Sequence, residues 1–171
     1  LKKILLIFLG TILLTLSAKI KIPFYPVPMT MQTFMVLLIG IALGWKMSLI
    51  TISIYLAEGI LGIPVFAGTP EKGIGIIYFT GPTMGYLIGF LLATFLAGYL
   101  NFKTNLFFIF FKLIFCVSTI YILGILWLGF LIGWDKPIIQ LGVTPFIFAE
   151  LFKILLLTLL TNKIIKFRKF I

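Results

Sequence analysis

The 171-residue sequence contains no histidine, one cysteine and four acidic residues. Histidine is the most common general base and metal ligand near neutral pH, so the usual centre for either role is missing. The lone Cys116 cannot form an internal disulfide, and its apolar neighbours predict plain packing. With Glu71 and Asp135 in expected loops, only Glu58 and Glu150 remain at membrane depth. We therefore expect no metal site and no catalytic residues.

Motifs for nucleotide binding and hydrolysis are also absent. The sequence has no G-x-x-x-x-G-K-[ST] stretch, so it lacks a phosphate-binding loop and should not hydrolyse ATP. Neither G-x-S-x-G nor H-E-x-x-H occurs. We expect a protein that is not an enzyme and carries no cofactor; an intramembrane enzyme is the weaker alternative.

Charged residues are scarce and apolar residues dominate. The chain is 62% hydrophobic and 11% charged, with mean hydropathy +1.27, whereas soluble domains carry about 25% charged residues. A membrane-spanning helix needs about 20 residues, with a range of roughly 17–25. The sequence predicts an all-α integral membrane protein, a single domain over residues 1–171 with six transmembrane helices at about 4–18, 29–45, 47–63, 84–100, 105–133 and 145–162.

The connections between these segments alternate in charge. One set, which includes both ends of the chain, holds nine basic residues: Lys2, Lys3, Lys46, Lys103, Lys112, Lys163, Lys166, Arg168 and Lys169. The other set holds four: Lys19, Lys21, Lys72 and Lys136. The positive-inside rule then places both termini in the cytoplasm. The net charge of +10 predicts contact with anionic lipid of the bilayer, and its scatter over helix ends argues against nucleic acid.

All eight prolines fall in or beside the connections expected outside: Pro23, Pro26, Pro28, Pro64, Pro70, Pro82, Pro137 and Pro145. Proline stiffens a loop and lowers the entropy lost on ordering it. Loops on one face of a rigid scaffold are where binding usually occurs. The alternative, that prolines merely end helices, does not explain why the cytoplasmic connections have none.

Glu150 and Lys153 interrupt the last apolar segment. Residues three apart share one face of a helix. A charge at membrane depth costs roughly 2.5–3.5 kcal/mol on insertion scales, so charged residues there usually serve a function. We interpret the pair as a ligand site; a structural ion pair that locks two helices is the alternative. Another regular feature, the small residues Gly85, Gly89, Ala93 and Ala97, predicts close packing of segment 84–100 inside the bundle, with contact to another protein as the alternative.

Three stretches together resemble the BioY family, the biotin-binding S components of energy-coupling factor (ECF) vitamin transporters. They are I-P-F-Y-P-V-P-M-T-M-Q-T (22–33), Y-L-A-E-G-I-L-G-I-P-V-F-A-G (55–68) and T-G-P-T-M-G-Y-L-I-G-F (80–90). The resemblance runs from about residue 15 to residue 160. It implies a six-helix S-component bundle in a prokaryotic cell membrane. Such a subunit takes biotin from outside and delivers it inward with a coupling membrane subunit and two ATPase subunits.

The resemblance also implies a set of ligand-binding residues. These are Glu150, Lys153, Thr30, Gln32, Phe66 and Tyr86. The family typically has Gly-Asp where this chain has Ala149-Glu150, which moves the carboxylate one methylene further from the backbone. Alternatively, Thr30 and Gln32 are a helix cap and a core amide, and the two aromatic residues are interfacial anchors.

Partner docking and ligand identity leave alternatives open. S components usually dock through small residues on the first helix, where this chain offers Gly10, Thr11, Thr15 and Ala18 without a clean alanine pair. The rival functions are an S component for another small carboxylate-bearing vitamin and a stand-alone carrier.

Overall fold

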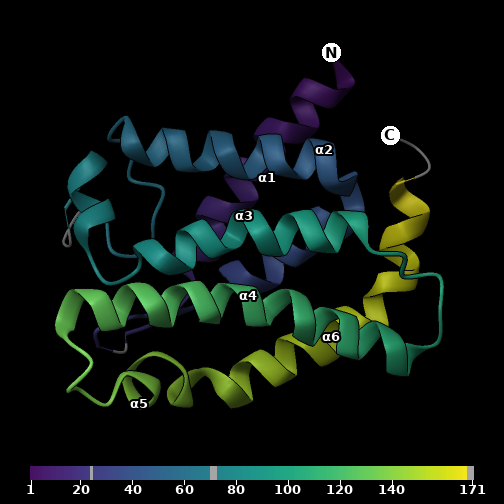
Figure 1. The fold of residues 1–171 in the computed structure, drawn as a ribbon. Coiled ribbons are helices and arrows are strands. Elements are labelled where there is room, and N and C mark those ends of the chain that lie inside the picture. Colours follow the sequence, from purple (N-terminus) through teal and green to yellow (C-terminus); the bar gives the residue numbers. More distant parts are fainter. Residues whose placement is uncertain (24, 70–72, 169–171) are drawn as a thin grey trace.

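The protein is a bundle of long helices (Figure 1). The computed structural model describes residues 1–23, 25–69 and 73–168, so Phe24, Pro70, Glu71, Lys72 and Lys169 lie outside the described residues. The helices are α1 (Lys2–Lys19), α2 (Gln32–Ile60), α3 (Met84–Tyr99), α4 (Leu106–Ile132), α5 (Ile138–Gly142) and α6 (Ile147–Arg168). Two 3-10 turns, η1 (Gly75–Thr80) and η2 (Thr144–Phe146), and two short strands, β1 (Lys21–Ile22) and β2 (Met29–Thr30), complete the described elements.

Three helical stretches in the described part are long and apolar enough to cross a membrane, namely Gln32–Ile60, Leu106–Ile132 and Ile138–Arg168. A fourth apolar helix, Met84–Tyr99, is shorter. These stretches confirm the all-α membrane class predicted from the sequence. Hydrophobic side chains such as Phe130 and Phe148 are exposed around the bundle, as expected for surfaces that face lipid tails rather than water.

Helix α2 reverses direction at Gly44. This residue has φ 74° and ψ 164°, a backbone conformation that glycine adopts at little cost. The Gln32 amide nitrogen lies 2.8 Å from the Tyr55 hydroxyl oxygen, although these residues would be about 35 Å apart in a straight helix. Helix α2 is therefore an antiparallel pair of helices, and the predicted segments 29–45 and 47–63 are its two halves.

The connections gather at two opposite ends of the bundle. Residues 61–69, 73–83 and 133–146 lie on the left of Figure 1, whereas connection 100–105 and the end of α6 lie on the right. The connection between α1 and α2 lies at the same end as residues 61–69. Lys19, just before it, contacts the Phe66 carbonyl, and Thr30, within it, contacts Lys153 near the start of α6. We call this end the loop-rich end. Every proline in the described residues belongs to its connections or their edges.

Small residues on α3 allow close helix packing, as the sequence predicted. A β-carbon on Gly89 would lie 2.6 Å from the Ile120 Cα of α4, and one on Gly98 would lie 2.6 Å from the Trp45 Cα of α2. Ala93 and Ala97 are fully buried. A larger side chain in place of either glycine would collide with the neighbouring helix. These small residues of α3 therefore serve contacts within the chain.

Two features of the loop-rich end did not follow from the sequence. Strands β1 and β2 pair antiparallel, with Lys21 opposite Thr30, and α5 forms one short helix before α6. Elements this short carry too little periodicity to stand out in a sequence. They matter because β2 lines the cavity described next, and the last residue of α5, Gly142, accepts a hydrogen bond from Tyr86 of the cavity wall.

Candidate ligand-binding site

A cavity lies at the loop-rich end, between the β1–β2 hairpin, the α2 start, α3, α4 and α6. Its wall contains Thr30, Gln32, Thr33, Thr83 and Glu150 as polar residues. The remaining wall is apolar or aromatic, from Val27, Pro28, Met29, Ala67, Tyr78, Tyr86, Leu87, Phe90, Ile120, Tyr121 and Phe146. Small-molecule sites typically have mostly apolar walls and a few polar groups that orient the ligand. This cavity therefore suits a small amphipathic ligand.

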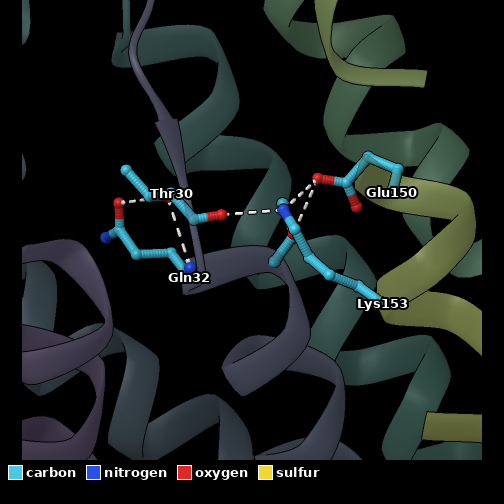
Figure 2. A network of polar contacts seen from close by, with 5 residues as sticks. Thr30, Gln32, Glu150 and Lys153 are labelled. Carbon is cyan, nitrogen blue, oxygen red and sulfur yellow. Dashed lines mark hydrogen bonds and ion pairs between the residues drawn. The ribbon is translucent and has the colours of Figure 1, made fainter. Parts of the chain in front are cut away.

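Glu150 and Lys153 form a buried ion pair on one face of α6 (Figure 2). The Lys153 ammonium donates to Glu150 Oε1 at 2.6 Å, to the Thr30 carbonyl at 2.7 Å and to the Thr33 hydroxyl at 3.0 Å. The Thr33 hydroxyl in turn donates to Glu150 Oε1 at 2.8 Å. An ammonium has three N–H donors, so these acceptors occupy all of them. The pair ties α6 to the hairpin and to the start of α2.

The second carboxylate oxygen of Glu150 has no hydrogen-bond partner. Glu150 Oε2 is the one buried side-chain polar atom without a partner in the described part of the chain, and it bears no dashed line in Figure 2. The Tyr121 side chain lies beside this carboxylate and interacts with it through charge and a weak hydrogen-bond contact, but no donor reaches Oε2 with the distance and angle of a full hydrogen bond. Buried polar atoms almost always have partners. An unpaired carboxylate oxygen in a cavity wall is an acceptor available to an N–H or O–H donor of a ligand.

Thr30 and Gln32 line the cavity and also have structural contacts. The Gln32 backbone N–H donates to the Thr30 hydroxyl at 3.3 Å, as in a helix cap, and that hydroxyl lies 3.2 Å from Gln32 Oε1. The Gln32 side-chain amide donates to the Tyr55 hydroxyl at 2.8 Å. Both interpretations drawn from the sequence are therefore compatible with this structure, since each residue borders the cavity and packs within the fold.

Tyr86 stands in the cavity wall, but Phe66 does not. The Tyr86 hydroxyl donates to the Gly142 carbonyl at 2.9 Å, which leaves its ring as a wall surface. Phe66 is buried behind the wall, with its ring 4.8 Å from that of Tyr78 and 5.3 Å from that of Tyr55, measured between centroids. Tyr78 occupies the cavity side of this stack, so a ligand contact by Phe66 stays a prediction.

Several cavity residues were not assigned from the sequence. The Thr33 hydroxyl forms hydrogen bonds with both Glu150 and Lys153. It was not assigned from the sequence, although it lies only three residues after Thr30 where the chain enters α2. Tyr78, Thr83, Phe90, Tyr121 and Phe146 come from four further parts of the chain. Their positions depend on tertiary packing and had no local signal.

The small residues of α1 face inward. Gly10, Thr11 and Ala18 are buried, and Thr15 is partly buried. A β-carbon on Gly10 would lie 2.6 Å from the Thr51 methyl group of α2. Their role in docking a partner stays a prediction, and in this structure they pack α1 against α2.

Comparison with known proteins places this geometry in a family. The sequence profile of the BioY family matches residues 1–170. A probable biotin transporter BioY of Pyrococcus horikoshii is 40% identical over 152 residues, which are 89% of each chain. The biotin transporter BioY of Thermotoga maritima is 35% identical over 157 residues, 91% of each chain.

A solved structure has the same fold. It is the crystal structure of the S component for biotin from an ECF-type ABC transporter, with TM-score 0.79 and 25% sequence identity. The match covers 96% of this chain and 91% of that one. The family profile, the relatives and the shared helix arrangement agree along nearly the whole chain, and this protein belongs to the BioY family.

Proposed function

We propose that this protein is the membrane-embedded biotin-binding S subunit of an ECF-type importer. The observation that carries this proposal is the unpaired oxygen of Glu150 in the wall of a mostly apolar and aromatic cavity. The similar proteins are biotin transporters, and the similar structure is a biotin S component. The protein binds and hands over its ligand rather than transforming it.

The chemistry of biotin fits the cavity. Its ureido ring has two N–H donors and a carbonyl acceptor, its thiophane ring is apolar, and its tail ends in a carboxylate. Glu150 Oε2 accepts one ureido N–H in a charge-assisted hydrogen bond, the strongest type available there. The aromatic wall of Tyr86, Phe90 and Phe146 covers the apolar ring. Thr30 and Gln32 supply neutral hydrogen bonds beside it.

Lys153 contributes to this site chiefly through Glu150. With three acceptors around its ammonium, it fixes Oε1 and leaves Oε2 aimed at the ligand. The ion pair thus fits both interpretations drawn from the sequence. It holds α6 to the hairpin as a structural ion pair, and it orients Glu150 as a ligand-binding group.

Direct titration of the purified protein in nanodiscs tests the proposal. We expect biotin to bind one-to-one, desthiobiotin to bind because it retains the ureido ring, and lipoate to bind far more weakly because it lacks that ring. Isothermal calorimetry measures all three. Equal binding of lipoate, or no binding of biotin, would refute the assignment and favour another carboxylate-bearing vitamin.

We also propose that both termini lie in the cytoplasm and that the loop-rich end faces outward. The nine-to-four distribution of basic residues supports this orientation. Because Cys116 is buried, a cysteine placed at exposed Asp135 gives a clean signal. In right-side-out vesicles, we expect a membrane-impermeant maleimide to label Asp135→Cys but not Lys103→Cys. The opposite labelling pattern would reverse the assigned orientation.

A further inference from the structure

Residues 65–69, which we call the roof segment, lie between α2 and η1 and form part of the cavity wall through Ala67. All five residues are buried. The segment has no regular secondary structure that would pair its backbone groups. Buried carbonyl and N–H groups need partners. The segment supplies some itself, since the Thr69 N–H and hydroxyl both donate to the Phe66 carbonyl, and side chains from other elements supply others.

Two lysines donate to three of the carbonyl groups. The Lys19 ammonium, at the end of α1, donates to the Phe66 carbonyl at 2.9 Å and to the Thr69 carbonyl at 3.3 Å. The Lys21 ammonium, in β1, donates to the Ala67 carbonyl at 2.8 Å. The roof segment is thus held from one side by two charged donors on neighbouring residues.

Two tyrosines complete the attachment. The Tyr55 hydroxyl donates to the Val65 carbonyl at 3.0 Å, and the Tyr78 hydroxyl accepts from the Gly68 N–H at 3.3 Å. Gln32, a cavity residue, donates in turn to the Tyr55 hydroxyl. These tyrosines are buried in the bundle, whereas Lys19 and Lys21 are solvent-exposed. The hydrogen bonds from the two lysines can therefore break without disturbing the core, whereas those of the tyrosines cannot.

Lys21 also connects the roof segment with the ion pair. It lies opposite Thr30 in the β1–β2 pairing, and the Thr30 carbonyl accepts from Lys153. The hairpin is therefore tied at one point to the roof segment and at another to the Glu150–Lys153 pair. A displacement of the hairpin would release both.

We propose that Lys19 and Lys21 are positioning residues that clamp the roof segment over the cavity and set the rates at which ligand enters and leaves. The inference rests on the proposed biotin-binding function. The cavity is small for a ligand with the bulk of biotin, so part of its wall must move for entry, and the roof segment is a part held by hydrogen bonds from exposed side chains. Breaking those bonds is then the slow step in both directions.

Lys19→Met and Lys21→Met test the clamp, because methionine keeps an apolar stem and removes the N–H donors. We expect each variant to raise both the association and the dissociation rate constants of biotin about three- to tenfold. This is the scale of one charged hydrogen bond weakened by solvent exposure. Stopped-flow fluorescence and a chase with unlabelled biotin measure the rates. Lys136→Met, on an outer loop where Lys136 pairs with Asp135, is the matched control and should leave both unchanged.

The pattern of rates separates a clamp from a merely structural role. Faster dissociation with unchanged or slower association would mean that the lysines stabilise the bound state, and it would overturn the proposal. Unchanged rates in both variants would do the same. Lys21→Arg, which keeps a charged donor, should remain close to the parent protein.

A second measurement does not depend on biotin. In the ligand-free protein, the Gly68 amide should exchange with deuterium faster in Lys19→Met and Lys21→Met than in Lys136→Met. Unchanged exchange at Gly68 would reject the clamp. If the parent protein fails to bind biotin while Gly68 exchange responds as expected, the proposed function fails and the clamp stands.

Discussion

Replacing Glu150 by alanine should weaken biotin binding by roughly 2–5 kcal/mol, the scale for truncating one partner of a buried charged hydrogen bond. This corresponds to a loss of about thirtyfold to several-thousandfold in affinity. The variant loses the only buried acceptor without a partner in the described cavity wall. Lys153→Ala should fall in the same range, because Glu150 then loses the donor that fixes its orientation. Calorimetric titration in nanodiscs measures both.

Suitable controls distinguish a ligand contact from a structural lock. Asp135→Asn removes an exposed loop carboxylate and should leave affinity within about twofold. Glu150→Asp restores the residue typical of the family and should retain binding. Both alanine variants should still insert into the membrane, since removal of a charge lowers insertion cost. If both fold and bind biotin as tightly as the parent protein, the ion pair only locks α6 to the hairpin.

The second large effect concerns energy coupling. In proteoliposomes that contain this chain alone, we expect biotin to bind but not to accumulate above its external concentration. A proton-driven carrier needs a buried group that changes charge as it moves. Of the intramembrane candidates, Glu150 and Lys153 are locked to each other and to Thr33, and Glu58 sits near the loop-rich end of α2. Accumulation should therefore require the ECF coupling subunit and two ATPase subunits that we propose as partners.

Uptake of radiolabelled biotin, with and without an imposed proton gradient, checks this expectation. Vesicles with Glu150→Ala give the matched background, because they lack the binding that otherwise mimics uptake. Addition of the coupling and ATPase subunits should produce accumulation that depends on ATP. Accumulation by the chain alone would support the stand-alone carrier instead.

Docking to such partners also shows where sequence inference reaches its limit. Gly10, Thr11 and Ala18 have the small side chains that suit a helix–helix interface, but they are buried against α2. Small residues allow close approach of any helix. Composition therefore predicts that a tight contact exists, and only the fold identifies which helix makes it.

The same limit applies to the candidate site. Glu150, Lys153, Thr30, Gln32 and Tyr86 could be selected because charge at membrane depth and family motifs are visible in one dimension. Phe66 belongs to the same motifs, yet it lies behind the cavity wall. A motif marks residues that matter together, but it does not tell whether a ring faces the ligand or supports its neighbour.

The sequence by itself determined the membrane class, the six apolar segments and the shared face of Glu150 and Lys153. These properties depend on local composition and on the helical period, which any window of the chain contains. Only the tertiary structure decided that Thr33 completes the ion pair from 117 positions away, that Glu150 keeps one oxygen unpaired, and that two lysines hold the roof segment. Such contacts depend on how distant helices and loops meet, and that is set by packing of the whole bundle rather than by any local pattern.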